Sequence, residues 1–238
     1  MKTRRAIWLS ALALCAALAA TTSFAQSEDW QSKPYQQWTM KDVQKVLSDS
    51  PWAKTIARSG GMGTSGQNLP DKVYTLRLRS ALPIRQGLLR LRQLKDDYDK
   101  MSDKKKAEFD EKNKALIDCP PCEDNYVLAL VPPSASEGRM SLPASLKSAT
   151  VESLKLYVQL SDDRGQRREL VHYVPPKAVG QEVVFFFPKF NEKGEPLITP
   201  SSKRVSFNID PAAMGGDATI THFDFDVSKM IVGGKVVF

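Results

Sequence analysis

Apolar residues are spaced mainly as in helices up to about residue 117 and mainly as in strands beyond it. Thr39, followed three residues later by Asp42, has the pattern of a capping box at the start of a helix. Apolar residues recur at helical spacing after it, which predicts a short helix over 40–48. A further turn is expected to begin at Ser50-Pro51, so helices are predicted mainly within 39–58 and 83–117.

A strand and a helical hairpin are predicted next. Residues 73–80 alternate between apolar and polar side chains, which is typical of a half-buried strand. Pro83 opens a predicted helix that runs to about Lys100. Ser102 is expected to cap a second, highly charged helix to about Ile117. These two helices are expected to pack together as a hairpin.

Beyond Cys122 the apolar period becomes two, and turn residues separate the alternating segments. The predicted strands are 125–131, 151–160, 168–174, 181–187, 203–209, 219–227 and a terminal one near 231–238. Short strands at this spacing favour a β-sandwich. The predicted fold class is therefore α+β: a mainly-β, immunoglobulin-like sandwich with an inserted helical hairpin and an N-terminal helical segment.

The first 25 residues have the pattern of a cleavable secretory signal peptide. Basic residues near the N-terminus precede a 15-residue apolar stretch over 6–20, which is shorter than the ~20 residues that span a bilayer as a helix. Ser23-Phe24-Ala25 then presents the small residues that a signal peptidase recognises. We therefore expect an exported protein, periplasmic or extracellular.

Three regions are expected along the chain. They are a signal peptide at 1–25, an N-terminal helical segment with a Gly-rich loop at 26–70, and a sandwich domain at 71–238 with the hairpin inserted at 83–117.

The charge balance is that of an ordinary solvated surface. The chain has 34 basic and 27 acidic residues, and removal of the predicted signal peptide leaves 31 and 27. This is far from the concentrated positive charge of a nucleic-acid-binding protein. No segment after the signal peptide is apolar enough to predict a membrane helix. We therefore expect neither nucleic acid as a partner nor a transmembrane span in the mature chain.

Two cysteines remain after the predicted signal peptide, in the motif Cys119-Pro120-Pro121-Cys122. Thiol–disulfide oxidoreductases place such a pair after a strand and at a helix N-terminus, which stabilises the thiolate. Here a helix is expected before the pair and a strand after it. A structural disulfide is therefore favoured, and thiol–disulfide exchange through Cys119 stays open as the alternative.

Metal and cofactor sites have weaker signals. His222, Asp224 and Asp226 alternate within a predicted strand and are weak candidates for metal ligation, although the same alternation fits a solvent-facing surface. Gly61–Gly66 matches G-x-G-x-x-G letter for letter, but it follows a helical segment and leads into a strand. We interpret it as a loop and expect no cofactor.

Four aromatic residues lie before the first predicted strand: Trp30, Tyr35, Trp38 and Trp52. They could form a platform for a sugar or a peptide. Their helical spacing with neighbouring apolar residues favours packing of the N-terminal segment against the sandwich.

The chain resembles uncharacterised exported bacterial proteins over about the first half of the mature sequence. The resemblance is carried by Trp38, Ser50-Pro51-Trp52-Ala53, the segment 79–85 and the Cys119–Cys122 corner. It implies no activity and no site residues. We expect a non-enzymatic binding or structural module with an envelope or extracellular partner. The alternatives are thiol–disulfide exchange and a hydrolase whose residues are distant in sequence.

Export predicts a mature protein that begins at or near Gln26, because cleavage after Ala25 fits the pattern of small residues. N-terminal sequencing of the protein from a secreting host tests this. Recovery of intact chains beginning at Met1 would contradict it.

Overall fold

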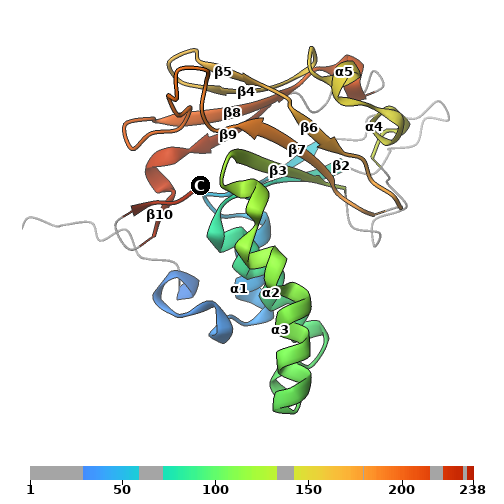
Figure 1. Ribbon diagram of the computed structural model, residues 1–238, viewed down its shortest axis with the longest axis vertical. Coiled ribbons are helices and arrows are strands. Elements are labelled where there is room, and N and C mark those ends of the chain that lie inside the picture. Colours follow the sequence, from blue (N-terminus) through green and yellow to red (C-terminus); the bar gives the residue numbers. More distant parts are fainter. Residues whose placement is uncertain (1–28, 59–71, 133–141, 179, 215–221, 233–234) are drawn as a thin grey trace, which may run out of the picture.

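Two antiparallel sheets and a group of helices form the part of the chain that the computed structural model describes, residues 29–58, 72–132, 142–178, 180–214, 222–232 and 235–238. One sheet has the order β1-β2-β3-β7-β6 and the other β5-β4-β8-β9. The second sheet lies over the first, and α1, α2 and α3 extend away on the far side (Figure 1). The predicted α+β class is confirmed, and the layout is compatible with a sandwich.

The first sheet comprises β1 (Ala53–Arg58), β2 (Lys72–Leu78), β3 (Asn125–Val131), β6 (His172–Val174) and β7 (Val183–Pro188). The second comprises β4 (Val158–Asp162), β5 (Arg167–Glu169), β8 (Arg204–Ile209) and β9 (His222–Asp226). A short hairpin follows, made of β10 (Ile231–Val232) and β11 (Lys235–Val236). The helices are α1 (Met40–Ser48), α2 (Leu82–Lys95), α3 (Asp103–Asp118), α4 (Ala144–Ser148) and α5 (Val151–Leu154). The predicted signal peptide, the Gly61–Gly66 motif and positions 219–221 of the predicted strand 219–227 lie outside the described residues.

A layer of phenylalanines joins the two sheets. Phe207 on β8 lies with its ring centroid 5.2 Å from that of Phe185 and 6.1 Å from that of Phe187, both on β7. Phe223 on β9 lies 6.3 Å away on its other side. All four rings are buried, because strand alternation directs them to the same interior. This layer is the centre of the core.

The N-terminal helix forms as its sequence predicts. The Thr39 hydroxyl accepts a hydrogen bond from the backbone N–H of Asp42, and the Asp42 carboxylate accepts one from the backbone N–H of Thr39. The apolar face of α1 packs on α2, where Gly87 allows close approach. A Cβ atom at Gly87 would lie 3.0 Å from a methyl carbon of Leu47. The backbone of α2 at Gly87 therefore lies in close contact with the side chain of Leu47 on α1.

Four strand and turn predictions are wrong in part. The turn expected after Ser50-Pro51 is followed by strand β1, which pairs with β2 over its whole length. The segment 151–160 begins as α5, because Thr150 caps a helical turn through Ser153. The segment 168–174 divides between the two sheets, with Arg168 opposite Leu160 and Tyr173 opposite Phe185. The described residues of the terminal strand form the β10–β11 hairpin.

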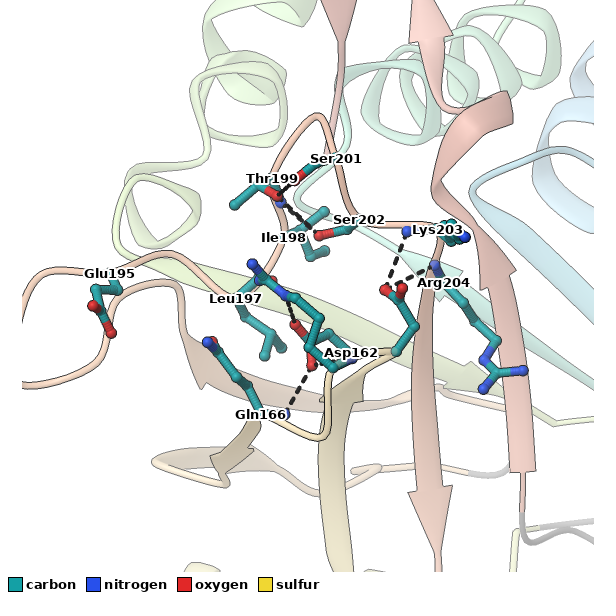
Figure 2. A network of polar contacts seen from close by, with 12 residues as sticks. Asp162, Gln166, Glu195, Leu197, Ile198, Thr199, Ser201, Ser202, Lys203 and Arg204 are labelled. Carbon is teal, nitrogen blue, oxygen red and sulfur yellow. Dashed lines mark hydrogen bonds and ion pairs between the residues drawn. The ribbon is translucent and has the colours of Figure 1, made fainter.

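A polar network fixes the β4–β5 turn (Figure 2). The buried carboxylate of Asp162 accepts hydrogen bonds from the backbone N–H groups of Arg164 and Gln166, at 3.0 and 2.8 Å. The neighbouring carboxylate of Asp163 accepts one from the N–H of Lys203 at 3.1 Å. The turn is thus tied to the segment that leads into β8.

In the described part of the chain, no helix has both the length and the apolar character needed to cross a membrane.

The phenylalanine layer predicts a large effect of Phe207→Ala. Loss of the ring should lower the free energy of unfolding by ~3–5 kcal/mol, since a cavity remains in a closely packed interior. Leu156 is 73% exposed, so Leu156→Ala should change it by less than ~0.5 kcal/mol. Urea denaturation of both variants measures this. Equal effects would contradict the assigned core.

Candidate functional site

A cleft of about 470 Å³ lies along the helical hairpin, between α2 and α3, beside the 3₁₀ turn Tyr35–Gln37. Its volume falls in the range of roughly 300–1,000 Å³ that is typical of ligand sites. The hairpin was predicted from sequence and is confirmed, although α2 ends at Lys95 and not near Lys100, and the side chain of Ser102 makes no capping hydrogen bond to α3. Asp97, in the left-handed conformation with φ of 53°, lies between the two helices, where the chain reverses. The cleft is therefore bounded by the helices α2 and α3 and by the turn Tyr35–Gln37.

Arg90 forms a buried wall of this cleft and is only 7% exposed. Its Nε donates to the carbonyl of Trp38 at 3.1 Å, and one terminal nitrogen donates to Gln93 Oε1 at 3.3 Å. The two terminal nitrogens reach the two oxygens of Asp99 at 3.4 and 3.1 Å. A buried guanidinium needs such partners to offset its loss of hydration. The hydrogen bond from Arg90 lowers the pKa of Asp99.

Asn113 forms the buried part of the cleft wall on α3. It is 4% exposed, its Oδ1 accepts a hydrogen bond from Arg92 at 2.6 Å, and its Nδ2 donates to the carbonyl of Phe109 at 2.8 Å. The Arg92 bond links α2 directly to α3. With both amide groups engaged, Asn113 holds the two helices at a fixed separation.

Two tyrosines line the cleft, and one of them, Tyr98, binds a carboxylate. The Tyr98 hydroxyl donates to Asp110 Oδ2 at 2.8 Å. Burial and this hydrogen bond raise the pKa of Tyr98 to about 12. Burial and the charge of Asp110 also raise the pKa of Tyr35. Burial is the largest cause of both shifts, and the charge of Asp110 adds to each, while Arg90 acts in the opposite direction on Tyr35.

The charges that line the cleft are unbalanced. Arg90 and Asp99 form an ion pair and largely cancel. The remaining charged residues are Asp110, Glu111 and Asp118 against Lys114. Cationic groups next to this lining offset part of its negative charge: Nζ of Lys106 lies 5.7 Å from the centroid of the Tyr98 ring, and Arg92 donates to Asn113.

Cys119 and Cys122 form the predicted disulfide, with their Cα atoms 5.3 Å apart. Cys119 is the C-terminal cap of α3, and a 3₁₀ turn, Pro120–Cys122, leads from it towards β3. The order of helix, pair and strand is as predicted. A thiolate at Cys119 would lie at the negative end of the α3 dipole, which disfavours it. The disulfide also borders an apolar groove of about 280 Å³ against Val184 and Phe186.

The three weak candidates for metal ligation do not meet at one site. His222 and Asp224 lie on the exposed face of β9, with Nε2 of the histidine 2.8 Å from Oδ1 of the aspartate. Asp226 instead caps the next turn by accepting from the backbone N–H of Ser228. Among the residues that the structure describes, no group of three or more histidine, cysteine or acidic side chains is placed to hold a metal ion.

The aromatic group divides between packing and the cleft. Trp30, Trp38 and Trp52 are buried, with edge-to-face contacts at 5.6 and 6.1 Å. Tyr35 is partly exposed and lines the cleft. The tryptophans are therefore packed in the core, and Trp30 and Trp38 also line a second cleft of about 510 Å³. Tyr35 lines both clefts.

Sequence reasoning missed the polar walls of the cleft. A signal for them was present: Gln93 lies four residues after Leu89, and Asn113 four residues after Phe109, on the apolar stripes of their helices. Polar residues at stripe positions point into an interface and need partners there.

Comparison of the chain with family models, with curated proteins and with solved structures finds no match in any of the three.

The geometry at Cys119 predicts that the disulfide is stable and not catalytic. Thiol titration of the unreduced protein should find no free cysteine at Cys119 or Cys122. The double variant Cys119→Ser, Cys122→Ser should fold with a loss of at most ~2 kcal/mol, because the closed loop is very short. The native protein should not accelerate insulin reduction by dithiothreitol, and turnover in that assay would contradict the prediction.

Proposed function

We propose that this protein is an exported, non-enzymatic binding module of the cell envelope or extracellular space, and that the hairpin cleft is its binding site. The observation that carries the proposal is the construction of the cleft. Its walls contain buried polar side chains, Arg90, Gln93 and Asn113, whose positions are fixed by hydrogen bonds. Concave sites with a few fixed polar groups are typical of ligand binding.

The order of the strands supports an immunoglobulin-like sandwich. The run β2-β3-β7-β6 corresponds to strands A-B-E-D, and β5-β4-β8-β9 to C′-C-F-G, with every neighbouring pair antiparallel. In this assignment β1 is an added edge strand, and the α2–α3 hairpin is inserted between A and B. Sandwiches of this kind commonly carry binding sites on their connections, so the analogy favours the hairpin.

The proposal of export is supported by the signal-like pattern at 1–25 and by the Cys119–Cys122 disulfide. Disulfides persist in oxidising compartments and are rare in the cytosol.

Thiol–disulfide exchange is the second candidate, and one observation favours it. Cys119 is partly exposed and borders the apolar groove, so a substrate thiol has a route to its sulfur. The position of Cys119 at a helix C-terminus makes it the weaker candidate.

A fragment screen by two-dimensional NMR tests the cleft as the binding site. The probes are small aromatic and aliphatic compounds of positive, zero and negative charge. We expect the shifts caused by binding compounds to cluster on α2, α3 and the turn at Tyr35. Ala107→Trp should abolish them, because Ala107 is exposed and lines the cleft.

Glu108→Trp is the matched control, since Glu108 is exposed on the same helix and does not line the cleft. It should leave the shifts unchanged. Fragments that bind elsewhere, equally in both variants, would contradict the proposed site.

A further inference from the structure

A separate cavity lies at the edge of the second sheet, and we infer that it binds a small organic acid, with the carboxylate on the buried guanidinium of Arg168 and the carbon body on the ring of Phe190. The cavity has a volume of about 380 Å³ and lies between the edge strand β5 and the segment 188–193 (Figure 1). This site goes beyond the proposed function and does not depend on the hairpin cleft.

Arg168 is a buried charge without a counter-charge. It is the middle residue of β5 and is only 6% exposed. Nη1 donates to the carbonyl of Arg167 at 3.0 Å and Nη2 to the carbonyl of Glu195 at 2.8 Å, and both acceptors are uncharged. Nε is buried and has no partner. Among the described residues no carboxylate forms an ion pair with Arg168, whereas the similarly buried Arg90 is paired with Asp99.

The free donors of this guanidinium need a negatively charged acceptor. An arginine side chain has five N–H groups, and the two hydrogen bonds use two of them, so three remain for a ligand. Gln166 Oε1, two residues earlier, is also buried without a partner. It carries no charge, so a contact with it, direct or through a water, would leave the charge of Arg168 uncompensated. Because a buried charge is costly until it is paired, a bound anion is the missing partner.

The exposed charges around the cavity do not replace this partner. Two of each sign line it, and water and salt screen them: Arg167, Lys193, Glu169 and Glu192. Glu195 presents its carbonyl to Arg168, while its carboxylate accepts a hydrogen bond from Asn191 Nδ2 at 2.8 Å. One buried positive charge is therefore left over. It matches a singly charged carboxylate better than a phosphate group, whose second charge would have no partner.

The rest of the lining suits the carbon body of an acid. Phe190 is 48% exposed and lines the cavity together with Pro188. An exposed ring beside a cation provides apolar surface for the body of a ligand whose charged end is bound. Asn191 fixes this wall, because its Oδ1 accepts hydrogen bonds from the backbone N–H groups of Lys193 and Glu195, at 3.0 and 2.9 Å. A wall held in this way loses little entropy when a ligand binds.

The test compares benzoate with two compounds of nearly the same shape. Benzamide is the neutral counterpart, and benzamidinium is the cationic one. Each is titrated into the purified protein at neutral pH, and binding is followed by the NMR shifts of residues 167–169 and 188–193. We expect benzoate to bind at least tenfold more tightly than benzamide, and benzamidinium to cause no shifts there. Equal binding of the three compounds, or no shifts with benzoate, would overturn the inference.

A variant at Arg168 localises the effect. Arg168→Met removes the charge and keeps a long apolar side chain, so benzoate binding should weaken at least tenfold. Saturating benzoate should raise the melting temperature of the native protein and leave that of the variant unchanged. Arg204→Met is the control, because it removes an exposed positive charge from the same sheet at a position outside the cavity, and binding should stay within twofold. A loss in Arg204→Met as large as in Arg168→Met would show a non-specific field and overturn the inference.

Phe190→Ala tests the site even if the Arg168 variant does not fold, because Phe190 is half exposed. Loss of the ring should weaken benzoate binding at least threefold. Unchanged binding in this variant, or binding of inorganic phosphate tenfold tighter than that of benzoate, would overturn the organic acid as the ligand. Failure at this cavity leaves the proposed function standing, since the hairpin cleft is tested by shifts on α2, α3 and the turn at Tyr35.

Discussion

The arrangement of the helices depends on the hydrogen bonds that the buried guanidinium of Arg90 donates. It binds the carbonyl of Trp38, the side chain of Gln93 and the carboxylate of Asp99, which belong to three different segments of the chain. A charge buried in this way is tolerated only when its partners are in place. The N-terminal turns, α2 and the start of the connection to α3 must therefore adopt their positions together. The cleft is complete only when all of these segments are in place.

The two sheets form the base from which the hairpin extends (Figure 1). Trp52, which directly precedes β1, ties the N-terminal turn and the C-terminus to the first sheet, because its ring is buried against Trp30 and its Nε1 donates to the carbonyl of Val237. At the other end of the hairpin, the Cys119–Cys122 disulfide fixes the point where α3 ends and the chain turns towards β3. The candidate site is thus held by regular elements at both ends, as a preorganised site requires.

Features encoded by neighbouring residues could be predicted from the sequence, and features set by distant contacts could not. The capping box at Thr39 and the two helices of the hairpin depend on local spacing, and they were predicted correctly. The division of 168–174 between two sheets was missed, because an alternating pattern does not specify the partner of a strand. The cleft was missed for a related reason: Arg90 and Asp110 are ordinary helix-surface residue types until the fold places both of them in the lining of one cleft.

Hydrogen exchange of the Arg90 Nε–H group, measured by NMR, tests most directly whether the cleft is preformed. The account predicts a slowly exchanging signal, because this group is buried and donates to the carbonyl of Trp38. Arg167, which is exposed on β5, provides the reference for fast exchange. Exchange at Arg90 as fast as at Arg167 would show that the guanidinium is free in solution, and would contradict the account of the cleft.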